Sequence, residues 1–396
     1  MSVTRRTAAK AAIAAGGLAV TAAAGLRHPV FGGTPRGARR ARLEGSPQWA
    51  AGRFANTLPT GVGASLAAVR DWLVGGSPHR TPDAPVPTVA RRRADFDAPA
   101  ALRLTWLGHG TSLVELDGRR FLIDPVFSRH ASPGPLFGVA RFFEPPLPLG
   151  ELPALDAVLL THDHYDHLDR GTVESLAGSV PRWLAPLGVG AHLERWGVPP
   201  DRIEELDWWD EAEVGGVRVV ATPARHFSGR GLTDRNRTLW CGWALLGEAG
   251  REGAPARSVW SSGDGGYGPH FAEIGRRLGP FCASLVEVGA YNRSWADIHM
   301  GPEQAVRAVQ DARGGLLVPV HWGTFDLALH GWTEPAERAL VAAEAAGVPV
   351  AVPRPGAFVE PLAASDRRAA DAERWWPALA WETAADAPVT SSGGAP

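Results

Sequence analysis

His162-Asp163-His164-Tyr165-Asp166-His167 is the stretch that decides how this chain folds. It follows the apolar run of residues 157–161, which predicts a buried strand. Side chains two apart in an extended loop point the same way, so His162 and His164 can converge on one ion. The tighter turn after them directs Asp166 and His167 towards a neighbouring position. Two ions about 3.5–4 Å apart can share a hydroxide that is nucleophilic at neutral pH, so the pattern predicts a metal centre rather than a polar loop with incidental histidines.

The overall composition is that of a globular protein. The chain has 396 residues, of which 45% are hydrophobic, and its formal net charge is −2. This charge gives no reason to expect nucleic-acid binding. The two cysteines, Cys241 and Cys282, lie in apolar runs, which excludes a disulfide framework and favours free buried thiols.

Residues 1–25 have the pattern of an export signal. Arg5 and Arg6 precede an alanine-rich apolar stretch that ends in small residues at 22–24. Paired arginines before a weakly apolar stretch favour the twin-arginine route, which would place the protein in the periplasm or outside the cell. The alternative is a disordered N-terminus on a cytoplasmic protein.

The rest of the chain divides into three parts. Residues 26–98 are rich in Pro, Arg and Gly and predict an extension that wraps the core, with one helix at 61–74. Residues 99–362 carry the hydrolase domain, and residues 363–396 form a tail that we expect to be partly disordered.

The hydrolase domain has two groups of strands, each followed by helices. Strands are predicted at 102–107, 112–116, 120–123, 157–161, 182–185, 217–222, 238–246, 257–262, 283–288 and 316–320. Helices are predicted at 171–177, 189–196, 271–278, 302–313 and 334–346. This order predicts an α+β fold in which two sheets pack face to face with helices outside, a four-layer αβ/βα sandwich.

Three further ligand candidates each follow a predicted strand. They are His226, His321 and Asp264, the last in the glycine-rich turn at 263–266. We assign one ion to His162, His164 and His226. The second ion is assigned to Asp166, His167 and His321, with Asp264 bridging the two. Mixed nitrogen and oxygen ligands favour two Zn²⁺, and iron or manganese are alternatives.

The spacing of these ligands resembles the metallo-β-lactamase superfamily. Further motifs resemble its N-acylphosphatidylethanolamine-hydrolysing phospholipase D group, and they lie at 52–56, 59–60, 106–111, 124–128, 205–209, 280–281, 289–291 and 320–325. The similarity covers about residues 50–330. It implies a phosphodiesterase that releases phosphatidic acid and an N-acylethanolamine. One departure is Gly265, which stands where that group has threonine in Gly-Asp-Thr-Gly.

In the reaction that this resemblance implies, a metal-bridging hydroxide attacks phosphorus, Asp264 orients it and Asp166 holds the second ion. His299 is the candidate proton donor to the leaving group, with a helix-capping or packing role as the alternative. His109, after the first predicted strand, is either a support for the ligands or structural. Arg225 and Arg230 flank His226 and could bind a phosphate.

Two other functions are compatible with the same motifs. A lactonase or other acyl hydrolase would use the ions to attack a carbonyl carbon, and a binding protein would keep an idle site. The expected partner is a small-molecule or phospholipid phosphodiester, with possible membrane-surface contact and no nucleic acid. The sequence leaves the oligomeric state open.

Overall fold

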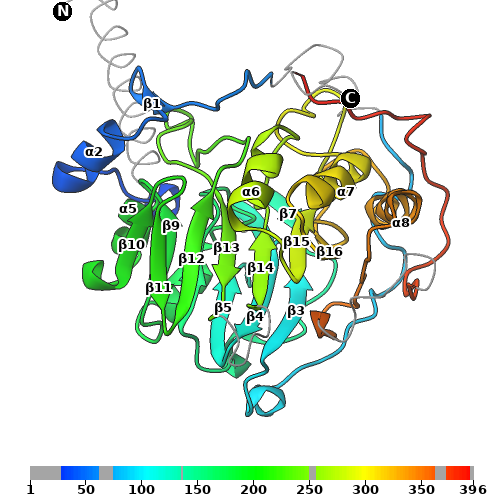
Figure 1. The fold of residues 1–396 in the computed structure, drawn as a ribbon, viewed down its shortest axis with the longest axis horizontal. Coiled ribbons are helices and arrows are strands. Elements are labelled where there is room, and N and C mark those ends of the chain that lie inside the picture. Colours follow the sequence, from blue (N-terminus) through cyan, green and yellow to red (C-terminus); the bar gives the residue numbers. More distant parts are fainter. Residues whose placement is uncertain (1–27, 62–74, 135–136, 249–255, 362–371, 393–396) are drawn as a thin grey trace, which may run out of the picture.

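The computed structural model describes residues 28–61, 75–134, 137–248, 256–361 and 372–392. The predicted export signal at 1–25, all but the first residue of the predicted helix at 61–74, and residues 363–371 and 393–396 of the predicted tail lie outside the described residues. Two mixed sheets form the centre of the molecule, and helices lie against them (Figure 1). The predicted four-layer α+β sandwich is confirmed.

The first sheet has seven strands in the order β10-β9-β8-β5-β4-β3-β17. Its strands are β3 (Leu102–Gly108), β4 (Thr111–Leu116), β5 (Arg119–Ile123), β8 (Ala157–Leu159), β9 (Trp183–Pro186), β10 (Ile203–Leu206) and β17 (Phe358–Val359). β3, β4 and β5 form an antiparallel meander, and β5, β8, β9 and β10 are parallel. Asp117 and Gly118 both have positive φ, 48° and 79°, as a two-residue type I′ hairpin turn requires.

The second sheet has six strands in the order β11-β12-β13-β14-β15-β16. Its strands are β11 (Glu211–Val214), β12 (Val217–Thr222), β13 (Gly242–Leu246), β14 (Ser258–Ser261), β15 (Ala283–Glu287) and β16 (Leu316–Val320). The first four are antiparallel, and β14, β15 and β16 are parallel. The parallel strands are buried along their whole length, including the polar residues Ser284 and Glu287 of β15.

Helices cover both sheets. The helices of the hydrolase domain are α4 (Arg170–Leu176), α5 (Gly190–Arg195), α6 (His270–Leu278), α7 (Pro302–Asp311) and α8 (Glu334–Ala346). Each of them was predicted, with bounds within two residues. Figure 1 shows α6 and α7 in front of the second sheet and α5 beside β10 of the first. The largest core cluster contains residues of both sheets, among them the fully buried Trp106, Trp243 and Trp260.

One predicted strand is shorter in the structure. The sequence pattern favours a strand from Thr238 to Leu246, but β13 begins only at Gly242. Residues before it pair with the other sheet, because the Leu239 N–H donates to the Leu187 carbonyl and the Cys241 N–H to the Thr161 carbonyl. The same apolar run therefore bridges the two sheets, which a period-two pattern cannot reveal.

The segments outside the two sheets carry structure that sequence patterns missed. These elements are η1 (Pro29–Phe31), α2 (Gly37–Glu44), β1 (Trp49–Ala50), β2 (Arg53–Phe54), η2 (Arg93–Phe96), β6 (His130–Gly134), β7 (Phe137–Ala140), η3 (Leu149–Glu151) and η4 (Pro200–Arg202). In the tail, Trp375 and Trp376 are buried in the main core cluster, and the Trp375 ring lies 5.5 Å from that of Trp322.

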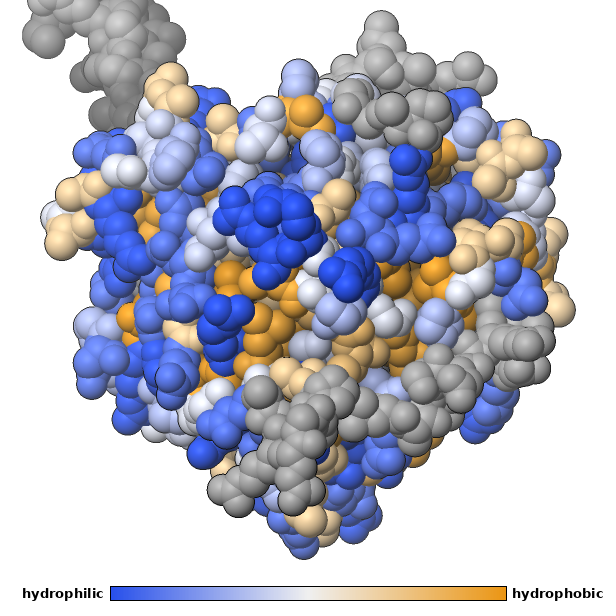
Figure 2. All heavy atoms as spheres, viewed as in Figure 1, coloured by the Kyte–Doolittle hydropathy of each residue, from blue (hydrophilic) through white to orange (hydrophobic). Residues whose placement is uncertain are grey.

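Hydrophilic residues dominate the raised parts of the face drawn in Figure 2, and hydrophobic residues gather in recesses between them. Among the described residues, Leu232 and Val341 are the large hydrophobic side chains that are exposed, by 93% and 55%. In the same part of the chain, none of the helices has the length and apolar character needed to span a bilayer.

Candidate metal centre

The predicted ligands meet where strands of both sheets end. The loop with His162 follows β8, His226 follows β12, Asp264 follows β14 and His321 follows β16. Because these strand ends lie at the interface of the two sheets, side chains far apart in the sequence converge there. All seven predicted metal ligands are brought together in one buried site.

Three histidines form what we call the first donor group: His162, His164 and His226. Nδ1 of His164 lies 2.9 Å from Nε2 of His162 and 3.2 Å from Nε2 of His226. The rings of His162 and His226 are nearly perpendicular, at 77°, with centroids 4.7 Å apart. Three nitrogens from two chain segments therefore face one point.

The second donor group consists of Asp166, His167 and His321. Nε2 of His321 lies 3.1 Å from Nε2 of His167, and Oδ2 of Asp166 lies 3.4 Å and 3.6 Å from these two nitrogens. His109, for which the sequence leaves a supporting and a structural role open, donates a hydrogen bond of 2.8 Å from Nε2 to Asp166 Oδ2 and so contacts this group.

Asp264 stands between the two groups. Its Oδ2 lies 3.0 Å from His321 and 3.1 Å from His167 in the second group. The same oxygen lies 3.9 Å from both His162 and His226 in the first group. One carboxylate oxygen thus faces both donor groups, as the bridging assignment requires.

Hydrogen bonds fix which ring nitrogens face the centre. His167 Nδ1 donates to Asp124 Oδ2 at 2.7 Å, and His226 Nδ1 donates to the Ile298 carbonyl at 2.8 Å. Thr161 donates its hydroxyl hydrogen to Asp124, so its oxygen is an acceptor for His162 Nδ1 at 2.9 Å. These bonds leave the Nε2 lone pairs directed inward, the arrangement in which histidines bind metals.

The distances between donor atoms fit a metal ion. A tetrahedral zinc ion with bonds of about 2.0–2.1 Å has neighbouring ligand atoms roughly 3.3 Å apart. The shortest separations between donors here run from 2.9 Å to 3.6 Å. The spacing and the chemistry of these nitrogen and oxygen donors therefore fit two cations.

The electrostatics of the site favour divalent cations. Burial would raise the pKa of Asp264, but His167 and His321 hold it well below its usual range. The pKa of Asp166 is likewise held low against burial, chiefly by His167. Burial lowers the pKa of His162 far below its ordinary value. At His321, burial also lowers the pKa, but the carboxylates of Asp264 and Asp166 together raise it to about 10. The buried carboxylates therefore attract positive charge to this site, which suits a metal.

One side of the site is open. The side chains of Asp166 and His299 are 17% and 14% exposed, whereas those of Asp264 and His226 are exposed by 3% or less. A substrate would therefore approach along this side. Burial lowers the pKa of His299 to about 4, and its Nδ1 lies 2.8 Å from Oε2 of Glu287.

The sequence did not indicate that Asp124 and Glu287 support residues of the site through hydrogen bonds. Asp124, at the end of β5, accepts hydrogen bonds from the Thr161 amide and hydroxyl and from His167. Glu287, at the end of β15, is fully buried and accepts a bond of 2.5 Å from the Gly265 amide. A lone carboxylate at the end of an apolar run was the signal that could have revealed each of them.

Two arginines do not have the role that was predicted. Arg225 and Arg230 are buried, and their guanidinium groups donate to backbone carbonyls. The prediction that they bind a phosphate is wrong, because both guanidinium groups are buried and already donate hydrogen bonds that join separate segments of the chain.

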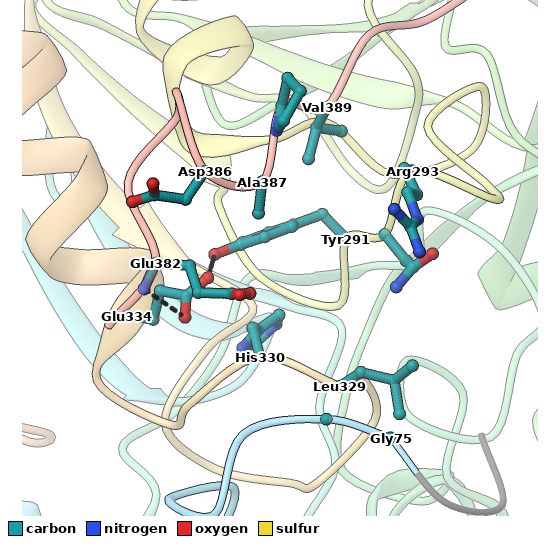
Figure 3. Close-up of a pocket in the computed structure, with 13 residues that line it drawn as sticks. Gly75, Tyr291, Arg293, Leu329, His330, Glu334, Glu382, Asp386, Ala387 and Val389 are labelled. Atoms are coloured by element: carbon teal, nitrogen blue, oxygen red, sulfur yellow. Dashed lines mark hydrogen bonds between the residues drawn. The ribbon is translucent and has the colours of Figure 1, made fainter. Parts of the chain in front are cut away.

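A pocket of about 330 Å³ lies beside the loop that joins β15 to α7. Tyr291 at the start of this loop forms one wall of the pocket, and the same loop continues to His299 at the metal centre. Figure 3 shows the tail residues Asp386, Ala387 and Val389 on another side. The tail is therefore packed along this loop.

Comparison with known proteins assigns the family. A family model described as "Beta-lactamase superfamily domain" matches residues 119–322, which contain every predicted metal ligand. The chain belongs to the beta-lactamase superfamily. It is a metal-dependent hydrolase of this superfamily, with relatives among the N-acylphosphatidylethanolamine-hydrolysing phospholipases D.

Three relatives illustrate its place in the superfamily. An uncharacterized protein of Mycobacterium tuberculosis is 46% identical over 365 residues, which is 90% of this chain and 95% of that protein. The N-acyl-phosphatidylethanolamine-hydrolyzing phospholipase D 1 of Caenorhabditis elegans is 36% identical over 59% of this chain and 67% of its own length. The mitochondrial protein of that name in Saccharomyces cerevisiae is 33% identical over 61% of this chain and 52% of its own length.

Proposed function

We propose that this chain is a dinuclear-zinc phosphodiesterase that hydrolyses N-acylphosphatidylethanolamine to phosphatidic acid and an N-acylethanolamine. The observation that carries the proposal is the pair of donor groups that share Asp264, in a chain whose relatives include two N-acyl-phosphatidylethanolamine-hydrolyzing phospholipases D. Two adjacent cations suit the displacement of an alkoxide from a phosphodiester.

The residues have distinct tasks in this reaction. The first donor group would hold one ion, the second donor group the other, and Asp264 would contact both. When bound, the two ions would lower the pKa of a water molecule and neutralise the charge of the phosphodiester. Asp264 would orient that water and accept its proton. The water oxygen forms the new bond to phosphorus while the bond from phosphorus to the ethanolamine oxygen breaks.

His299 is proposed as the proton donor to the departing alkoxide. It lies on the exposed side of the site, and burial keeps its imidazole neutral. Burial also raises the pKa of Glu287, so the Glu287 carboxylic acid can donate to His299 Nδ1, which places the ring hydrogen on Nε2 for the substrate. Its Nδ1 is 3.9 Å from Asp264 Oδ2, so the proposed donor and the residue that orients water are neighbours.

The experiment that tests the proposal is hydrolysis by the purified, zinc-loaded full chain. Three substrates are compared: N-acylphosphatidylethanolamine, a generic phosphate diester and a lactone. We expect release of N-acylethanolamine, lost in Asp264→Asn. Cleavage of the generic diester without the lipid would overturn the lipid assignment alone, and cleavage of the lactone alone would favour an acyl hydrolase.

The choice of metal is a separate proposal. A set of five imidazoles and two carboxylates suits zinc. Metal analysis of protein purified without added metal should find zinc, and iron or manganese in its place would contradict the choice.

Export is also proposed, through the arginine pair at positions 5 and 6. The double substitution Arg5→Lys and Arg6→Lys should retain the protein in the cytoplasmic fraction. Equal distribution of both forms between the fractions would contradict twin-arginine export.

A further inference from the structure

We propose that Asn56 and Asp297 are positioning residues for the ligand His226, and that they couple both ends of the described chain to the first donor group. This inference rests on the metal binding in the proposed function. It concerns residues that lie outside the strands and the metal-ligand loop.

Asn56 holds the backbone of His226 from two sides. Its Nδ2 donates to the His226 carbonyl at 2.7 Å, and its Oδ1 accepts from the His226 N–H at 3.1 Å. The same Nδ2 lies 2.7 Å from the Thr60 hydroxyl. A side-chain amide that satisfies both polar groups of one residue fixes that residue's position as a neighbouring strand would.

The neighbouring Arg225 is held by the same N-terminal segment. Its Nη2 donates to the Pro59 carbonyl and lies 2.9 Å from Asp297 Oδ1. Asp297 Oδ2 in turn accepts the Gly61 N–H at 2.9 Å. The carboxylate of Asp297 therefore joins residues 59–61 to the segment that carries His226.

The tail reaches the same carboxylate. Ser392 donates its N–H to Asp297 Oδ1 and its hydroxyl to Oδ2, both at 2.6 Å. The buried Ser391 hydroxyl donates to the Ala296 carbonyl at 2.8 Å. A Cβ on Gly301 would lie 2.8 Å from Cβ of Val389, so the tail packs closely where α7 begins. Figure 3 shows Val389 on the tail above Tyr291, earlier in this loop.

The loop held in this way touches the ring of His226. Ile298, the residue after Asp297, supplies the carbonyl that accepts from His226 Nδ1 at 2.8 Å. Gly266 explains how closely these segments approach, because a Cβ there would lie 2.2 Å from the Asp297 carbonyl oxygen. Asn56 thus sets the backbone of His226, and the Asp297 loop sets its ring.

The first experiment measures zinc affinity in Asn56→Ala by competition with a chromophoric chelator, in the full-length protein. Because loss of a residue that supports a metal ligand lowers metal affinity roughly 10-fold to 100-fold, we expect one of the two ions to weaken by about 10-fold. The other ion should keep its affinity.

Asn236→Ala is the matched control. Asn236 is also an amide that bridges to the N-terminal segment, since it donates to the Phe54 carbonyl at 3.2 Å and accepts from the Ser228 N–H at 3.4 Å. It makes neither of the contacts to His226. We expect this variant to lower the melting temperature of metal-free protein while both zinc affinities stay at wild-type values.

A second pair of variants tests the tail. Asp297→Ala should weaken the same ion as Asn56→Ala, whereas Asp386→Ala should leave both affinities unchanged. Asp386 is the comparable carboxylate of the tail, and it accepts hydrogen bonds from the hydroxyl and the amide of Thr383, at 2.7 Å and 3.1 Å.

The outcomes separate this inference from the proposed function. If wild-type protein binds no zinc, the proposed function fails. If it binds two ions and Asn56→Ala keeps both affinities, the positioning role is overturned. It is also overturned if Asn236→Ala weakens zinc as much as Asn56→Ala does, because the effect would then follow general stability.

Discussion

The two donor groups have similar ligands but are held by different parts of the chain. The second group is supported from the two sheets, because Asp124, directly after β5, accepts a hydrogen bond from His167 and His321 directly follows β16. The first group depends on distant segments, because His226 is held by Asn56, 170 residues away, and by the Ile298 carbonyl, 72 residues away.

This difference separates the framework of the fold from the assembly of the site. Strand ends placed by sheet packing can position the second group as soon as the sheets form. The first group also needs the N-terminal segment and the tail, because Gly61 and Ser392 both donate hydrogen bonds to Asp297 in the loop at 296–299. Variants of supporting residues should therefore weaken one ion more than the other.

The largest effect is expected where the two groups meet. Asp264→Asn removes the charge that faces both, and two-cation stabilisation of a transition state amounts to several kcal/mol. Hydrolysis of the phosphodiester should fall by on the order of 10³-fold. The rate constant under saturating zinc measures this, and a loss below 10-fold would contradict a shared ligand.

A smaller effect is expected at His299, which lies on the loop that supports the first group. His299→Ala should lower the rate by about 100-fold for an alkoxide leaving group, because proton donation contributes about that much. A p-nitrophenolate leaving group needs no proton, so its rate should hardly change. Equal losses on both substrates would contradict the role of proton donor.

Asp124 tests the second group. Asp124→Ala should weaken the second-group ion by roughly 10-fold to 100-fold, because Asp124 accepts a hydrogen bond from His167. The first-group ion should weaken less, because Asp124 reaches His162 through the Thr161 hydroxyl. The control is Asp169→Ala, which also removes several hydrogen bonds, from Ser128, Gly171 and Thr172, but none to a ligand. Zinc titration of both variants measures the contrast, and a larger loss of the first-group ion than of the second-group ion in Asp124→Ala would refute it.

The smallest effect is expected from Gly266→Ala. The added methyl group would press on the Asp297 carbonyl and shift the loop away from His226. We expect a few-fold weaker affinity for the first-group ion and a destabilisation of about 1–3 kcal/mol, as for overpacking. Gly178→Ala, where a Cβ meets open space, should change neither quantity, and chemical denaturation with zinc titration measures both.

The cluster of candidate ligands could be predicted from sequence because its signals are local. Four of them lie within six residues, and the other three each follow an apolar run at the end of a strand. Once the loop at 162–167 indicates a metal centre, strand ends are the places to search. The four-layer fold follows from the same order of strands and helices.

The supporting residues could not be predicted, because nothing near them in sequence marks their partners. Asn56 lies in a segment rich in Pro and Arg, and its contact with His226 exists only in three dimensions. The tail looked polar and unstructured, yet Trp375 is buried and Ser392 binds Asp297. Arg225 looked like a phosphate ligand because burial cannot be seen from its neighbours in the sequence.

The most direct test of the account is the zinc content of the purified full-length chain after equilibration with zinc and removal of the excess. The account predicts two zinc ions per chain, with one lost more readily to a chelator in Asn56→Ala. A single ion per chain, or none, would contradict the claim that two donor groups share Asp264.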